Sequence, residues 1–294
     1  MSSKIPQTES PNPRSAGLDL RDTPSLVALL IEEQQVAVEA VLAQRAAIAQ
    51  AVDAIASRLE RGGRLHYVGA GTSGRLGTLD AAEMPPTFGT PPELVRAHIA
   101  GGSQALVRAV EGAEDDGDAG DAAMREHVAS ADAVIGISAS GGAAFVVRAI
   151  ERARAIGAFT VAIVNVEESA LGDAAELRVV LATGAEALAG STRMKAGTAQ
   201  KVALNTISTA VMVRLGKVYD NLMVDVVASN RKLRERALRL VCTLTGVDRE
   251  RASELLERSG GRVKIAAVME RRGVDANEAA ALLSAHRGSL RALL

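Results

Sequence analysis

Residues 64–74 read RLHYVGAGTSG, and this stretch decides the fold class. A short apolar run, typical of a buried strand, leads directly into a loop of glycines and hydroxyl side chains. Residues 131–142 show the same arrangement, because the apolar run ADAVIGI precedes SASGG. We therefore expect both loops to follow strands of one sheet.

Further short apolar runs predict strands at 94–99, 159–165 and 177–181. Between and after them, three- and four-residue spacing of apolar residues predicts helices, including 143–156 and a long helix over about 193–215. Strands that alternate with helices are typical of a parallel sheet. The sequence therefore predicts an α/β fold, a doubly wound parallel sheet flanked by helices.

The two ends of the chain differ from this pattern. Residues 1–20 are polar, carry three prolines and predict an irregular arm. Residues 21–232 would form the α/β domain, opening with helices over about 24–42 and 47–59. From residue 233 onward, helical periodicity broken by glycines predicts a small helical domain, 233–294.

Composition excludes several classes of protein. Lys and Arg number 34 against 35 Asp and Glu, and aromatic residues make up 2%, so neither a basic surface nor a stacking surface for nucleic acid is expected. Cys242 is the only cysteine, and with four histidines a Cys/His zinc site is not expected. Without an apolar leader or an apolar run of about 18 residues, we expect a cytoplasmic protein that does not bind membranes.

The two glycine- and serine-rich loops are candidate phosphate sites. Ligands of parallel sheets bind at the carboxyl ends of strands, where the N-terminus of the next helix favours an anion. Glycine lets the backbone approach a phosphate, and hydroxyls can donate to its oxygens. Each loop taken alone could also be a simple tight turn. The candidate contacts are Gly71, Thr72, Ser73, Ser138, Ser140 and Gly141.

Residues 69–74 also match the dinucleotide pattern G-x-G-x-x-G. That kind of site usually needs an acidic residue near the end of the second strand, to bind the ribose hydroxyls. Here the second strand ends at Ile99 and continues Ala-Gly-Gly, with no acid. A terminal phosphate is therefore the better interpretation, and no cofactor is expected.

A third candidate segment, 190–195, reads GSTRMK and opens the long predicted helix. Ser191 could cap this helix, and Lys195 places a positive charge where an anion would bind. The alternative is a capped helix whose basic residues are solvated.

The chain has 35 acids, and the residue pattern alone does not single out Glu83 and Glu114, although both follow strand-end loops and could reach the site. Glu83 is expected just after the helix of the first loop, where Pro85 and Pro86 would stop that helix. Glu114 follows a predicted helical stretch that begins near Ser103. Enolisation of a sugar needs such a carboxylate or a histidine. The acid-rich run 115–121 lacks the spacing of a calcium loop.

Long stretches of the chain resemble N-acetylmuramic acid 6-phosphate etherases, a family with the SIS (sugar isomerase) fold. Two of them read YVGAGTSGRLGTLDAAEMPPTFG and GAEALAGSTRMKAGTAQKVALNTIST. All five are 9–20, 67–89, 99–116, 184–209 and 217–230. The resemblance covers nearly the whole chain and implies cleavage of the D-lactyl ether of the sugar phosphate, in peptidoglycan recycling.

The resemblance also implies roles for residues. Glu114 matches the family's residue that removes the C2 proton, and Glu83 matches the acid that assists the leaving lactate and the later hydration. It implies a sugar-phosphate substrate, no metal or redox cofactor, and a homodimer with the site near the subunit interface.

One departure concerns residues 142–144, which read GAA where the family usually has Arg-Thr-Pro. The lost threonine hydroxyl is a candidate phosphate or sugar contact, so this departure gives some weight to a second hypothesis, a non-catalytic sugar-phosphate sensor of the same fold. A third hypothesis, an aldose–ketose isomerase, shares the fold and the enediol chemistry but not the long motifs. The joint presence of Glu83 and Glu114 favours the etherase.

Overall fold

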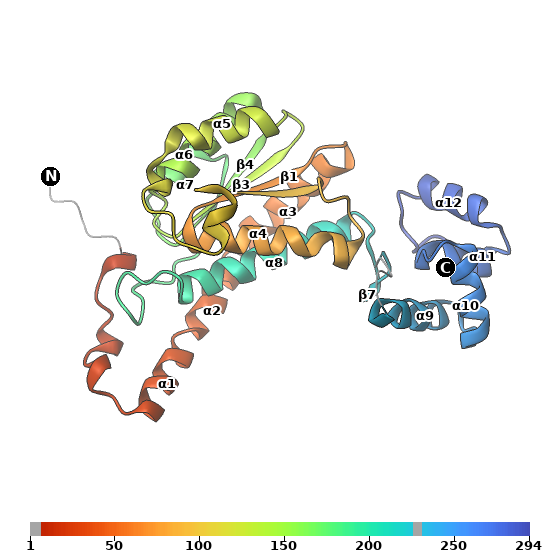
Figure 1. The fold of residues 1–294 in the computed structure, drawn as a ribbon, viewed down its shortest axis with the longest axis horizontal. Coiled ribbons are helices and arrows are strands. Elements are labelled where there is room, and N and C mark those ends of the chain that lie inside the picture. The colour runs from red at the N-terminus through yellow and green to blue at the C-terminus, as the bar shows by residue number, and fades with distance from the viewer. Residues whose placement is uncertain (1–6, 226–230) are drawn as a thin grey trace. The chain divides into compact units, whose positions relative to one another are not determined.

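The computed structural model describes residues 7–225 and 231–294 (Figure 1). The chain divides into two compact units. The first contains Met1–Ala81 and Glu93–Ser208, and the second contains Ala82–Pro92 and Thr209–Leu294. The domain limits expected from the sequence stay a prediction.

The first unit is built on a five-stranded parallel sheet with the strand order β2-β1-β3-β4-β5. All five predicted strands are confirmed within one or two residues. They are β1 (Leu65–Gly69), β2 (Val95–Ile99), β3 (Ala133–Ser138), β4 (Phe159–Val164) and β5 (Leu177–Val180). The strand order changes direction between β1 and β3, which makes this pair the switch point of a doubly wound sheet.

Helices cover both faces of this sheet, as Figure 1 shows. On one face, α5 (Gly117–His127), α6 (Ala144–Ile156) and α7 (Ala170–Ala174) pack against side chains such as Val68 and Val134. On the other face lie α3 (Arg45–Glu60), α4 (Gly71–Phe88) and α8 (Lys195–Arg214). Every residue of β1 and β3 is buried, because both faces are covered.

Two expectations about the helices are wrong. Pro85 and Pro86 do not stop α4, which continues to Phe88. Proline fits the helical φ, but it removes the hydrogen bond that its nitrogen would donate and its ring crowds the preceding turn, so α4 needs other contacts to continue. The last turn persists because Gly89 N–H donates to Pro85 O at 3.0 Å and because Met84 and Phe88, four residues apart, are both buried. The stretch expected to be helical from Ser103 is a single 3-10 helix, Gly102–Leu106.

The N-terminal residues precede the sheet as an arm and two helices. The arm is irregular as predicted, with short 3-10 helices at Gln7–Glu9, Pro13–Ser15 and Leu18–Leu20. Asp22 then caps α1 (Thr23–Glu32) by accepting from Ser25 N–H, and α2 (Gln35–Ala43) follows.

The second unit contains a hairpin and a helical tail, as the sequence predicted for the tail. The hairpin pairs β6 (Val218–Tyr219) with β7 (Leu222–Met223). The tail helices are α9 (Arg231–Thr245), α10 (Arg249–Arg258), α11 (Val263–Arg272) and α12 (Ala276–Ala285), which share one apolar core. Residues 226–230, the end of the resembling stretch 217–230, lie outside the described residues.

Within 7–225 and 231–294, no helix combines the length and the apolar character that crossing a bilayer requires.

Candidate functional site

The two predicted phosphate loops lie side by side at the switch point. Gly69, the last residue of β1, pairs with Ile137 near the end of β3. The loop after β1 leads into α4 on one face of the sheet, and the loop after β3 leads into α6 on the other. The structure therefore brings together the candidates 71–73 and 138–141 at the place where ligands of such sheets bind.

The loop after β1 is short, because α4 begins at Gly71, which has φ +52°. Thr72 and Ser73 consequently lie in the first turn of α4, where backbone N–H groups lack intrahelical acceptors. Gly69 permits this sharp turn, since a Cβ there would lie 2.6 Å from Gly74 N. The turn thus points donors and a helix dipole toward the switch point.

The loop after β3 is held by its own serines. Ser138 is buried and accepts a hydrogen bond from Gly141 N–H at 3.0 Å. Ser140 is exposed and accepts from Gly142 N–H at 3.3 Å. Because both hydroxyls accept these bonds, each keeps its single proton for another acceptor.

Ser73 differs, because its hydroxyl donates to Gln200 Oε1 at 2.8 Å. Gln200 Nε2 in turn donates to Asn165 Oδ1 at 2.9 Å, and Asn165 Nδ2 donates to Leu181 O at 2.9 Å. Sequence reasoning missed Gln200 and Asn165. The available signal was a long polar side chain at an inward position of a helix, four residues before the buried Leu204.

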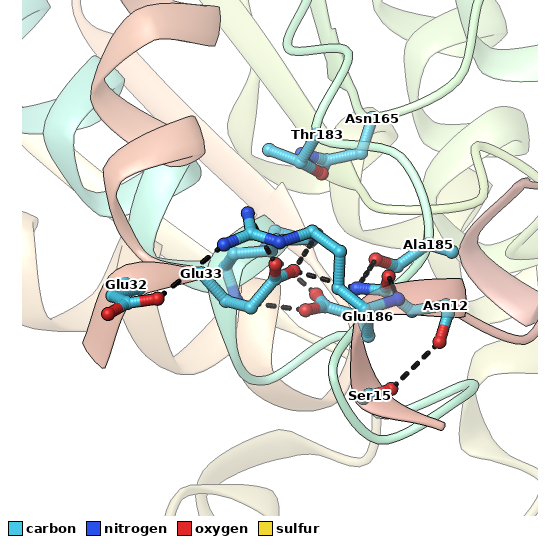
Figure 2. A network of polar contacts seen from close by, with 11 residues as sticks. Asn12, Ser15, Glu32, Glu33, Asn165, Thr183, Ala185 and Glu186 are labelled. Carbon is cyan, nitrogen blue, oxygen red and sulfur yellow. Dashed lines mark hydrogen bonds and ion pairs between the residues drawn. The ribbon is translucent and has the colours of Figure 1, made fainter. Parts of the chain in front are cut away.

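At the start of α8, acidic side chains of the protein itself bind the first backbone N–H groups and the ammonium group of Lys195. Figure 2 shows the side chain of Glu186 there, and its carboxylate accepts from Lys195 N–H at 3.1 Å and Ala196 N–H at 2.9 Å. Lys195 Nζ donates to Glu33 Oε2 at 2.6 Å, and both side chains are at most 5% exposed. Ser191 does not cap α8, which begins four residues later with Glu186 in the capping role. The phosphate roles expected for Ser191 and Lys195 stay predictions.

The pKa values of Glu33 and Glu186 are shifted in opposite directions. Burial alone would raise the pKa of Glu33, but the hydrogen bond and charge of Lys195, with Asn12 and Arg14, lower it below its usual value. For Glu186, burial outweighs its two backbone hydrogen bonds and raises the pKa. The N-terminal arm thus contributes to the α8 start through Asn12, as Figure 2 shows.

Another buried carboxylate, that of Asp80, joins α4 to α8 and β1. Asp80 accepts from Tyr67 Oη at 2.7 Å, Asn205 Nδ2 at 2.6 Å and Ser208 Oγ at 3.1 Å. Three donors satisfy the carboxylate without a cation. This network fixes α4 against α8 two helical turns after Ser73.

Glu114 lies exposed in the 3-10 helix Ala113–Asp115, between β2 and α5. Arg75 of α4 holds the preceding loop, since its guanidinium donates to Ala105 O at 2.9 Å and to Leu106 O and Arg108 O at 3.3 Å. A cavity of about 610 Å³ adjoins this loop, lined by His98, Gly101, Glu111 and Gly112 among others. Glu83 is exposed on α4, two residues before Pro85.

His98, which lines that cavity, is the middle one of three stacked histidines. His66 Nδ1 lies 3.0 Å from His98 Nε2, its Nε2 lies 3.3 Å from Asp132, and His127 stacks on His98. Burial lowers the pKa of His66 to about 4, and burial with the neighbouring His66 lowers that of His98 to about 3. These two imidazoles are therefore neutral at pH 7.

Family models match the first unit. The model described as the glucokinase regulatory protein N-terminal SIS domain matches residues 47–154, and the SIS domain model matches residues 112–210. Among solved structures, phosphoheptose isomerase of Neisseria gonorrhoeae has a TM-score of 0.51 at 17% identity and covers 64% of this chain and 97% of its own. At that identity the likeness shows the SIS fold alone, as expected from the sequence.

Curated relatives match over almost the full length. A Trichormus variabilis protein named N-acetylmuramic acid 6-phosphate etherase is 53% identical over 97% of this chain and 93% of its own. A Gloeobacter violaceus protein of the same name is 52% identical over 96% of this chain and 93% of its own. These identities extend through both units.

Proposed function

The chain belongs to the family of N-acetylmuramic acid 6-phosphate etherases, and we propose that Glu114 and Glu83 are the catalytic residues of its etherase reaction. The enzyme is a carbon–oxygen lyase that releases D-lactate from N-acetylmuramic acid 6-phosphate and forms N-acetylglucosamine 6-phosphate. This activity belongs to the recycling of cell-wall amino sugars. The assignment rests on the sequence identity to the named relatives, which is 53% and 52% over 97% and 96% of this chain.

The phosphate would bind at the switch point. First-turn N–H groups of α4 and the half-buried Thr72 supply donors from one side, and Ser138 and Ser140 supply hydroxyl protons from the other. α6 adds its N-terminus there, because its N-cap residue Ala143 forms no side-chain cap. At position 143, where the family usually has threonine, this chain offers no hydroxyl, and the uncapped N–H groups at the start of α6 would donate to the phosphate.

The chemistry is an elimination followed by an addition. With the sugar ring open, the aldehyde acidifies the C2–H bond, and Glu114 removes that proton. The C3–O bond then breaks, and Glu83 gives a proton to the departing lactate oxygen. Water finally adds across the double bond, with its hydroxyl on C3 and a proton returned to C2, so that both carboxyls end as they began.

We also propose a cytoplasmic homodimer. Exposed apolar side chains follow one another on α1 and α2 at Val27, Ile31, Val38 and Leu42. Val27 and Ile31 on α1, and Val38 and Leu42 on α2, are each four residues apart and so share a face of their helix, and exposed apolar faces are typical of protein interfaces. A second copy of the chain is the partner that the family resemblance implies.

The test is release of D-lactate from N-acetylmuramic acid 6-phosphate by the purified protein. Glu114→Gln should lower kcat by about 10²–10⁴-fold while phosphosugar binding persists, because only the base is lost. Glu126→Gln, at an exposed acid near the end of α5, is the matched control and should keep normal turnover. Normal kcat in Glu114→Gln would remove the base role, and no release by the unmodified protein would remove the etherase function.

A further inference from the structure

The second unit contains a cavity of about 590 Å³. The described residues that line it all belong to Ala82–Pro92 or Thr209–Leu294, so neither loop of the switch point contributes to it. Among these lining residues, the acid is Asp225 and the basic side chains are Lys217, Arg262, Lys264 and Arg287. The cavity therefore carries an excess of positive charge.

Lys264 holds the walls of this cavity together. Its side chain is 8% exposed, and its Nζ donates to Gly216 O at 2.7 Å, to Asp225 Oδ2 at 2.7 Å and to Gly288 O at 2.8 Å. These bonds use all three protons of the ammonium group. Lys264 thus joins the segments that follow α8, β7 and α12, and it has no proton left for a ligand.

Asp225 is shared by two lysines. Lys217 Nζ lies 3.2 Å from the same Asp225 Oδ2 that accepts from Lys264. Burial lowers the pKa of Lys264, and the charge of Lys217 acts in the same direction. Two ammonium groups at one carboxylate leave one positive charge over, and an anion in the cavity would offset it.

The two arginines of the cavity have unused donors. Arg262 Nε donates to Ser259 O at 2.9 Å, which leaves the terminal nitrogens of its guanidinium. Within 7–225 and 231–294, neither these nitrogens nor the guanidinium of Arg287 forms a hydrogen bond or an ion pair. A guanidinium can donate to two oxygens of one anion, so both side chains suit an oxyanion.

Backbone donors are present at the same cavity. α11 begins at Val263, and its N-cap residue Arg262 forms no side-chain cap. The N–H groups of a first helical turn lack intrahelical acceptors, and the helix dipole favours an anion there. The first-turn residues Val263, Lys264 and Ile265 are buried and line the cavity.

We infer that this cavity binds the phosphate group of a small molecule, with Lys217, Arg262 and Arg287 as its charged contacts. A phosphate group presents three terminal oxygens, which can occupy two guanidinium groups and the backbone donors together, whereas a carboxylate presents two. The volume lies in the range of about 300–1,000 Å³ that is typical of small-molecule sites, so the ligand extends beyond its phosphate.

The experiment follows backbone amide resonances by NMR on the isotope-labelled whole chain, with inorganic phosphate as the probe at constant ionic strength. The resonances of Gly260, Gly261 and Val263 should shift as phosphate is added. Arg262→Gln and Arg287→Asn should each raise the Kd read from these shifts about 3- to 10-fold, because a bond to a charged acceptor is lost from an exposed side chain. Asparagine suits position 287, where φ is +51°.

Two controls define the site and the chemical class of its ligand. Arg271→Gln makes the same change of charge at an exposed position near the other end of α11, outside the cavity, and should change the Kd less than about 2-fold. Succinate, a small dianion whose charges are both carboxylates, should bind at least about 10-fold more weakly than phosphate, because it offers fewer oxygens at one point.

Four results would overturn the inference. They are no phosphate-dependent shift at Gly260, Gly261 and Val263, an unchanged Kd in both cavity variants, an equal loss of affinity in Arg271→Gln, or succinate binding as tightly as phosphate. The resonances belong to the second unit and need no turnover. Failure of the etherase assay is therefore told apart from failure of this inference.

Discussion

The start of α8 and the loops at the switch point both look like anion sites in the sequence, yet the protein uses them differently. At the start of α8, Glu186 accepts from the first N–H groups and Glu33 pairs with Lys195. At the switch point, Ser138 and Ser140 keep their hydroxyl protons. The ammonium group of Lys195 is therefore paired within the protein, whereas the two serine hydroxyls each keep a proton that a ligand could accept.

This difference shows that a lysine in the sequence can be paired by an acid of the protein itself. The carboxylate that pairs with Lys195 comes from a position 162 residues earlier. A buried ammonium requires such a partner, since an unpaired buried charge is strongly unfavourable. Glycine and serine loops need no such compensation, because their donors are neutral.

Lys195→Met is the variant for which this comparison predicts the largest effect. It leaves the buried Glu33 with only the exposed Arg14 as an ion-pair partner, and we expect the free energy of unfolding, measured with urea, to fall by up to about 3–5 kcal/mol. Arg193→Met removes a charge from an exposed position of the same segment and should change stability by less than about 0.5 kcal/mol. If Lys195→Met is as stable as Arg193→Met and instead loses phosphate affinity, the contrast between the two regions is wrong.

The fold was largely predictable from the sequence, because each strand is an apolar run that ends in turn residues. Short runs such as 64–68 and 131–137, each bounded by turn residues, fit strands of a sheet that is covered on both faces. The error at Pro85 has a local cause. The rule that proline ends a helix ignores burial, and Met84 with Phe88 holds the last turn in place.

A second test uses two glycines with the same backbone angle, Gly141 at φ +68° and Gly184 at φ +67°. An added Cβ at Gly141 would lie 2.4 Å from Ser169 Cβ, whereas at Gly184 it meets nothing within 4 Å. Gly184→Ala should therefore cost only the left-handed strain, about 1–2 kcal/mol. Gly141→Ala should cost about 1–3 kcal/mol more, from crowding. Equal losses in urea unfolding would show that the loop after β3 is not tightly built.

A smaller effect is expected on how stability depends on pH, through the carboxyl groups at the start of α8. The raised pKa of Glu186 means that the folded protein binds a proton that the unfolded chain releases, so this group lowers stability as pH rises from about 4.5. Glu33, with its lowered pKa, acts in the opposite direction and loses its contribution as pH falls below about 4.5. Glu186→Gln removes only the first contribution.

Urea unfolding at pH 4.5 and pH 6 would measure this change. Relative to the unmodified protein, Glu186→Gln should gain stability more steeply with rising pH, by at most about 1.4 kcal/mol for each pH unit. An identical pH profile would mean that the carboxyl of Glu186 ionises as it does in the unfolded chain.

The site was less predictable than the fold, and the reason differs from residue to residue. Ser138 and Ser140 were identifiable because strand-end loops gather at one edge of a sheet. Gln200 and Glu186 were not, because their roles depend on partners set by the tertiary fold, at Ser73 and at the first turn of α8. Local sequence indicates which groups can donate, but only the fold determines which protons are already used.

The smallest expected effect belongs to Ser140→Ala. Ser140 is exposed, so water replaces much of what its hydroxyl gives to a phosphate, and the loss of phosphate affinity should be about 0.5–1.5 kcal/mol, or roughly 2- to 12-fold. Ser130→Ala, an exposed serine before β3, should have no effect. Inhibition of lactate release by inorganic phosphate would measure both. An effect at Ser130 equal to that at Ser140 would show that the carboxyl end of β3 is not where phosphate binds, because only the end of the strand distinguishes the two positions.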